Sequence, residues 1–352
     1  MSKCAELANL IGNINAGGGG ANRNVIINGA MNVAQRATSA TGLGGSDGYF
    51  TCDRWKLAFN TSGRITSAQD SSAPEGFSNS LKLSTTTADT SIASGEYLFL
   101  QQRFEGQNLQ TFAKGTSEAK PFALSFYVKG NANATYVAEL FDGDNSRQVS
   151  KAFNVTTSWS RVELSFPADT TGVLDDDNAT SMNLTIWLHA GSTYTSGTLN
   201  QTWNSNTNAN RVVGTSSILD STSRTFFITG VQLEVGQNPT FFEHEPFATT
   251  LPKCERYFQL NTATGGETYV ATQITTSMTM MTEMRSAPTI GAFDTTNRGF
   301  VDIGAATRFL TQIHGSDFTD KRGGVTNLGI TSTRGTQFHT MRGSMVSMDA
   351  EL

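Results

Sequence analysis

At 352 residues the chain is long enough for two domains, each with its own hydrophobic core. Only 16% of its residues are charged, against about 25% in typical globular proteins, and the formal net charge is −5. The absence of a basic stripe argues against a nucleic-acid partner. No apolar stretch approaches the eighteen or so residues that would predict membrane insertion, and the N-terminus lacks the apolar core of a secretion signal.

The cysteines and histidines are too scattered to predict a disulfide framework or a metal site. Three cysteines, Cys4, Cys52 and Cys254, are interpreted as free and mostly buried thiols. No ligand spacing links the four histidines, which are His189, His244, His314 and His339. The acidic triplet 175–177 is interpreted as a solvated turn rather than a calcium site. We therefore expect no metal and no cofactor.

Residues 1–21 predict a short amphipathic helix followed by a glycine tether. The apolar stripe of this helix follows i, i+3, i+4, i+7 spacing and consists of Leu7, Leu10, Ile11 and Ile14. A helix of about twelve residues is marginal alone in water, and the four glycines at 17–20 give it no rigid support. Two interpretations stay open: the helix packs back on its own domain, or it docks on another subunit.

Residues 22–248 read as short strands separated by turn residues. One apolar face of the segment 122–129 is formed by Phe122, Leu124, Phe126 and Val128. The segment 183–189 repeats the pattern with Leu184, Ile186 and Leu188. This period of two is typical of half-buried antiparallel strands, and Asp142 followed by Gly143 predicts a hairpin. Many short strands without helical intervals predict an all-β fold with a jelly-roll sandwich.

Two further segments shape the domain organisation. Residues 192–223 are polar and aperiodic, which predicts a long loop or arm over one end of the sandwich. Near residue 238 the composition changes to a mixed aromatic and charged run with spaced prolines. We interpret this run as a domain boundary and residues 249–352 as a smaller C-terminal β domain.

No motif predicts catalysis. The glycine–serine pattern at 44–48 matches a nucleophile elbow, but it lacks the strand before it and the helix after it that would expose a strained serine. We interpret it as an ordinary loop and expect no enzyme activity.

Trp187 predicts binding rather than catalysis. Leu184, Ile186 and Leu188 occupy one face of its predicted strand, so Trp187 lies on the opposite face. An aromatic ring among polar residues suits the packing of sugar C–H faces, with amides and hydroxyls nearby for hydrogen bonds. The predicted carbohydrate-binding residues are Trp187, His189, Tyr194 and Trp203. In the alternative interpretation, the polar loop folds back and buries Trp187 in a minor core.

Ten phrases in one order resemble a family of virion proteins of tailed bacteriophages, described as tail fibres or as structural proteins like carbohydrate-binding modules. The phrases are NRNVIINGAMNVAQR (22–36), DRW (53–55), GFSNSLKL (76–83), FEGQNL (104–109), AKPFALSFYVK (119–129), PADTTG (167–172), WLHAGSTYTSG (187–197), ITGVQLEVG (228–236), FFEHEPF (241–247) and CERYFQ (254–259). The resemblance runs from about residue 22 to 260. It implies a carbohydrate-binding-module-like jelly roll at 22–248, a small C-terminal β domain and a homotrimer, but no defined sugar site.

In this context we expect a virion protein assembled in the host cytoplasm, a tail fibre that binds host surface polysaccharide without catalysis. The N-terminal stripe then becomes the anchor, which docks on a tail adaptor, nozzle or capsid protein while the glycine tether absorbs a symmetry mismatch. Two alternatives stay open. In the first, the protein is a head fibre or decorating protein with no ligand of its own. In the second, it is a polysaccharide depolymerase, which no sequence feature favours.

Overall fold

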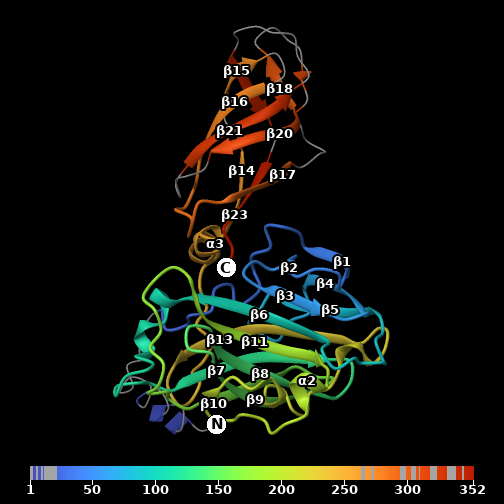
Figure 1. The fold of residues 1–352 in the computed structure, drawn as a ribbon, viewed down its shortest axis with the longest axis vertical. Coiled ribbons are helices and arrows are strands. Elements are labelled where there is room, and N and C mark those ends of the chain that lie inside the picture. The colour runs from blue at the N-terminus through green and yellow to red at the C-terminus, as the bar shows by residue number, and fades with distance from the viewer. Residues whose placement is uncertain are drawn as a thin grey trace. The chain divides into compact units, whose positions relative to one another are not determined.

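The computed structural model resolves the chain into two compact units, 1–247 with Leu352, and Ala248–Glu351 (Figure 1). The residues it describes are 3–4, 7–8, 11, 22–262, 266–270, 273–293, 299–302, 307–308, 310–317, 323–330, 338–342 and 345–352. Within these residues, no helix has both the length and the apolar character needed to cross a membrane.

The first unit contains a six-stranded antiparallel sheet. Its strands, in order across the sheet, are β1 (Ser39–Leu43), β4 (Arg64–Asp70), β5 (Ser80–Thr87), β13 (Thr225–Val235), β7 (Phe122–Gly130) and β10 (Ser160–Phe166). The late strand β13 lies between β5 and β7, so distant parts of the chain pair as neighbours. Such crossovers are typical of a jelly roll.

A seven-stranded antiparallel sheet forms the second layer. Its strands, in order, are β12 (Asn204–Ser205), β9 (Arg147–Val155), β8 (Ala134–Asp142), β11 (Thr180–Ala190), β6 (Tyr97–Glu105), β3 (Lys56–Asn60) and β2 (Gly48–Tyr49). Figure 1 shows β6, β11 and β8 side by side, with α2 (Ser192–Thr195) close to them. The predicted hairpin at Asp142 and Gly143 is confirmed, because β8 and β9 pair in register from Ala134 to Asp142.

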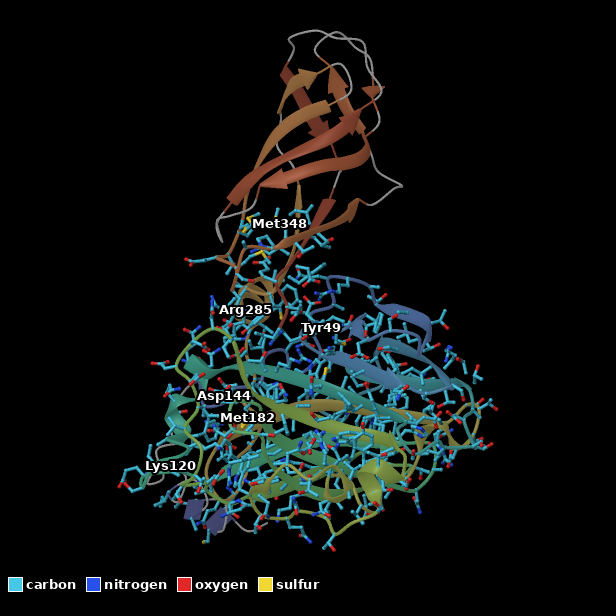
Figure 2. The ribbon with its side chains drawn as sticks, viewed as in Figure 1. Tyr49, Lys120, Asp144, Met182, Arg285 and Met348 are labelled. Atoms are coloured by element: carbon cyan, nitrogen blue, oxygen red, sulfur yellow. The ribbon has the colours of Figure 1, made fainter. Side chains whose placement is uncertain are left out.

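The core of the first unit lies between its two sheets and consists of the apolar faces that the alternation predicts. Phe122, Leu124, Phe126 and Val128 of β7 are all fully buried there, as are Leu184, Ile186 and Leu188 of β11. Met182, labelled in Figure 2, belongs to the same core. The predicted all-β sandwich is therefore confirmed, and it follows from the period-two pattern of each strand.

Helical segments are short and lie outside the sheets. They are α2, α3 (Phe247–Glu255) and the 3-10 turns η1 (Gly106–Asn108), η2 (Gln110–Phe112), η3 (Asn208–Asn210) and η4 (Ile218–Asp220). Residues 3–4, 7–8 and 11 are also helical, as the N-terminal pattern predicts. Leu7 and Ile11 are 57% and 49% exposed, and Leu10 and Ile14 lie outside the described residues.

The second unit contains two more antiparallel sheets. One consists of β14 (Phe258–Thr262), β23 (Met345–Asp349) and β17 (Thr289–Phe293). The other consists of β19 (Thr307–Arg308), β18 (Gly299–Asp302), β22 (Phe338–Arg342), β15 (Gly266–Val270), β16 (Gln273–Thr279), β21 (Gly323–Ile330) and β20 (Leu310–Asp317). Arg285 and Met348 are labelled in Figure 2, and Met348 is fully buried. Arg285 Nε donates to the Ala350 carbonyl at 3.0 Å.

We expect Phe126→Ala to lower the free energy of unfolding of the first unit by about 3–5 kcal/mol, the range for buried aromatic-to-alanine changes. Its ring is fully buried and packs edge-on against Phe153, with centroids 5.0 Å apart. All four tryptophans of the chain lie in this unit, so tryptophan fluorescence during urea unfolding reports on it alone. Val173→Ala is the control, because Val173 is 60% exposed. A loss below about 1 kcal/mol for Phe126→Ala would contradict this packing.

Candidate functional site

The outer face of the seven-stranded sheet carries three rows of side chains across its central strands. Strand pairing places residues from β3, β6, β11 and β8 next to one another in each row. The first row is Ala58, Phe99, Trp187 and Val137; the second is Lys56, Gln101, Thr185 and Glu139; the third, from β6 onward, is Arg103, Asn183 and Phe141. Trp187 thus lies on the outer face, as the alternation in its strand predicts.

The interpretation of Trp187 as an exposed sugar platform is nevertheless wrong. Its side chain is only 1% exposed, and its Nε1–H donates to Glu139 Oε2 at 2.9 Å. Trp187 belongs to a minor hydrophobic cluster with Val137 and Val212, flanked by Tyr97 and Phe99. The alternative interpretation holds, because the polar loop folds back over this end of the face.

An ion pair holds that loop in place. Arg211 Nε donates to Glu139 Oε1 at 2.8 Å and its Nη2 donates to Oε2 at 2.7 Å, in a bidentate geometry. The guanidinium carbon also lies 4.9 Å from the ring centroid of Trp187. Burial lowers the pKa of Arg211, but the Glu139 carboxylate raises it more, so the net shift is upward. The fully buried Glu139 carboxylate is thereby neutralised.

Backbone hydrogen bonds fix the rest of the loop to the sheet. The Ser150 N–H donates to the Asn200 carbonyl at 2.7 Å, and the Ser216 N–H donates to the Thr135 carbonyl at 2.7 Å. The short strand β12 pairs with β9. The expected long arm is therefore a fixed cover over β8, β9 and the end of β11.

The other predicted binding residues are also placed differently from the prediction. His189 is fully buried, with Nδ1 at 2.7 Å from Ser217 Oγ, and its burial lowers its pKa despite the nearby carboxylates. Tyr194 of α2 is half-buried, and its ring meets those of Tyr97 and Trp187. These residues form one neighbourhood, but their rings support the cover and do not present a stacking face.

Trp203 lies away from this neighbourhood, in the main core of the sandwich. Its Nε1–H donates to the Pro167 carbonyl at 2.9 Å, and its ring lies 5.0 Å from Lys114 Nζ. Lys114 is itself fully buried between the carboxylates of Asp142 and Asp169. Trp203 therefore packs in the core, and its ring offers no open face for sugar binding.

The open part of the outer face lies on β3 and β6. The half-buried rings of Tyr97 and Phe99 stack with centroids 5.2 Å apart. Beside them, Gln101 Nε2 donates to Thr185 Oγ1 at 3.1 Å and Arg103 Nε donates to Gln101 Oε1 at 2.9 Å. Gln101 and Thr185 are buried, so they hold Arg103 in place, while the two rings and Arg103 stay partly accessible. Flat rings beside a positioned polar group suit the recognition of a polyhydroxylated ligand.

Two cationic side chains, Lys56 and Arg103, lie on this open part of the face. Burial lowers the pKa of Lys56, and the neighbouring charge of Arg103 lowers it further, while Asp47 partly compensates. Two cations therefore lie close enough to repel each other. Lys56 Nζ is 3.6 Å from the exposed carboxylate of Asp47. An anionic group placed between the two cations would relieve their repulsion.

Sequence reasoning missed Phe99 and Arg103, although the signal was present. In the segment 97–104, alternation places Leu98, Leu100 and Phe104 in the core. The same alternation turns Tyr97, Phe99, Gln101 and Arg103 outward. The alternation that places Trp187 on the outer face of β11 predicts the same face for Phe99 and Arg103 when it is applied to β6.

Comparisons with known proteins identify no family. No protein-family model matches the chain, and no curated protein matches it. Solved structures with a similar fold include the enzymatically active domain of bacteriophage CBA120 tailspike protein 4, at 12% identity and a TM-score of 0.32. That alignment covers 60% of this chain but only 21% of the tailspike chain.

Carbohydrate-binding modules also appear among the similar structures. TmCBM61, solved with β-1,4-galactotriose, aligns over 60% of this chain and 99% of its own, at 10% identity and a TM-score of 0.32. A family 11 module from Clostridium thermocellum, solved with a mixed-linked tetrasaccharide, aligns over 59% and 99%, at 13% identity and a TM-score of 0.29. At these identities the structures do not identify a ligand or an activity for this chain.

Arg211→Ala is expected to destabilise the first unit by about 3–5 kcal/mol, because it leaves the buried Glu139 carboxylate without its cation. Arg211→Lys should fall between the alanine variant and the wild type, since lysine keeps the charge but not the bidentate geometry. Urea unfolding followed by tryptophan fluorescence measures both variants. Equal stability of the alanine variant and the wild type would contradict the proposed role of the ion pair.

Proposed function

We propose that the first unit binds a glycan through the open part of the outer face of its seven-stranded sheet. The observation that carries this proposal is the stacked pair Tyr97 and Phe99, half-buried beside the hydrogen-bonded row of Gln101, Thr185 and Arg103. All these side chains project from central strands and not from free loops. The Tyr97–Phe99 pair and the polar row beside it are therefore already in place before a ligand binds, which reduces the entropy cost of binding.

The proposed ligand is an acidic polysaccharide. Lys56 and Arg103 lie at the edge of the aromatic pair, where burial and then the charge of Arg103 lower the pKa of Lys56. A uronate or phosphate group at this position would pair with both cations, while the sugar ring packs on Phe99. Binding should therefore weaken as the salt concentration rises.

We further propose that the protein is a bacteriophage tail fibre that uses this face to bind the host surface without catalysis. The phrase-level resemblance supports the virion assignment, and the exposed Leu7 and Ile11 support the docking interpretation of the N-terminal helix. In this proposal the helix joins the fibre to another virion protein, and the chain assembles as a homotrimer. Incubation with host polysaccharide should release no new reducing ends.

Phe99→Leu should weaken binding to acidic host polysaccharide by at least about tenfold, because leucine keeps the packing on Trp187 but removes the flat ring. Binding is measured by biolayer interferometry of the full chain on a panel of immobilised bacterial surface polysaccharides. Carboxyl-reduced samples of the same polysaccharides test the need for negative charge.

The matched control is Trp159→Leu, which removes a half-buried aromatic ring that lies just before β10 and contacts Phe227 of the six-stranded sheet. This variant should bind as the wild type does. If Trp159→Leu abolishes binding and Phe99→Leu does not, the glycan site belongs to the other sheet and the proposed face is wrong.

Replacing Leu7 and Leu10 with Asp together should give a folded, soluble protein that is missing from assembled particles. A charged group in the apolar stripe would have to be buried without a partner on docking. Western blotting of purified virions measures incorporation, and retained polysaccharide binding by the free variant serves as the folding control. Normal incorporation of the double variant would refute the anchor.

A further inference from the structure

Three ionisable side chains from separate parts of the sequence meet at the edge of the covered end of the sandwich. Asp89 lies in the connection between β5 and β6, Glu96 directly precedes β6, and His189 lies near the end of β11. One donor atom from each residue falls within 4.8 Å of the other two. The sequence predicts no such cluster, because His189 is 93 positions from Glu96 and 100 positions from Asp89.

Imidazole Nε2 of His189 is buried and has no hydrogen-bond partner. It is directed at the acidic pair, with Glu96 Oε2 at 3.8 Å, which is too long for a hydrogen bond. The other ring nitrogen, Nδ1, lies 2.7 Å from Ser217 Oγ, and this hydroxyl also accepts from the Leu219 N–H at 3.0 Å. When Nδ1–H donates to Ser217, Nε2 presents its lone pair to the cluster, the arrangement found for histidine ligands of metals.

Each carboxylate is positioned by the backbone around it. Asp89 is buried, and its Oδ2 accepts from the Ser62 N–H at 3.1 Å and from Thr61 Oγ1 at 2.6 Å. Glu96 Oε2 accepts from the Ala93 N–H at 2.7 Å. The Glu96 side chain is 15% exposed, which gives an ion a route into the cluster and room for a water ligand.

From this geometry we infer that Asp89, Glu96 and His189 form a binding site for a divalent transition-metal ion, Zn²⁺ in the first instance. One imidazole nitrogen and two carboxylates suit Zn²⁺, whereas Ca²⁺ and Mg²⁺ take oxygen ligands. Tetrahedral coordination at about 2.0–2.2 Å places ligand atoms roughly 3.3 Å apart. His189 and Glu96 would have to approach by about half an ångström, and no pair in the cluster by more than about 1.5 Å.

The bound ion would tie the β5–β6 connection to the end of β11, close to the start of the loop that covers Trp187. The Gly191 N–H donates to the Glu96 carbonyl at 2.9 Å, so these two segments are already adjacent. The expected effect is a more stable first unit, since an ion that binds only the folded state shifts the unfolding equilibrium.

The test is a titration of ZnCl₂ into the full chain carrying Cys4→Ser, which removes the exposed thiol. Isothermal titration calorimetry should give one site per chain. At a free Zn²⁺ concentration about 100-fold above Kd, the melting temperature followed by tryptophan fluorescence should rise by about 5 °C or more.

Glu96→Gln is the diagnostic variant, because its amide oxygen can still accept from Ala93 while the charge of the ligand is lost. It should weaken Zn²⁺ binding by at least about tenfold and leave the melting temperature without zinc unchanged. His244→Gln, at an exposed histidine of the same unit, should bind Zn²⁺ normally. The inference is overturned if the parent chain does not bind Zn²⁺, or if Glu96→Gln binds as tightly as His244→Gln.

Discussion

The Glu139 carboxylate lies at the centre of the covered part of the seven-stranded sheet, fully removed from water. A buried carboxylate is tolerated only when a cation and hydrogen-bond donors compensate for its lost hydration. Arg211 supplies two of those hydrogen bonds and Trp187 supplies a third. Because Arg211 belongs to the loop and Glu139 to the sheet, this ion pair fixes the middle of the loop on the sheet, and backbone hydrogen bonds fix the rest. The position of the loop then divides the outer face into a covered part and an open part.

This division explains why the two halves of one face have different chemistry. Under the loop, Trp187 and Val137 form a small apolar cluster that completes the packing of the unit. Beyond the loop, Phe99 and Arg103 occupy outward positions of β6 and stay half-buried. The contact between Phe99 and Trp187, with ring centroids 4.8 Å apart, joins the two halves. The proposed glycan platform therefore rests on the same packing that holds the cover in place.

Much of the fold could be predicted from the sequence, because alternation is a local signal. It placed Leu184, Ile186 and Leu188 in the core and turned Trp187 outward, and both assignments are confirmed. Whether an outward residue is exposed depends on what lies above it, and this is a long-range property. Arg211 is separated from Glu139 by 72 positions, and nothing in the local pattern indicates that they meet. The cluster of Asp89, Glu96 and His189 escaped prediction for the same reason.

The measurement that tests the central claim most directly is hydroxyl-radical footprinting of the full chain with and without an acidic host polysaccharide. Aromatic side chains react strongly with the radical, so the protein carries its own probes on the proposed face and at separate positions in the loops outside it. The account predicts reduced labelling of Tyr97 and Phe99 in the complex, with unchanged labelling of Trp159 and Phe241. Unchanged labelling of Tyr97 and Phe99 in a sample that binds polysaccharide would contradict it.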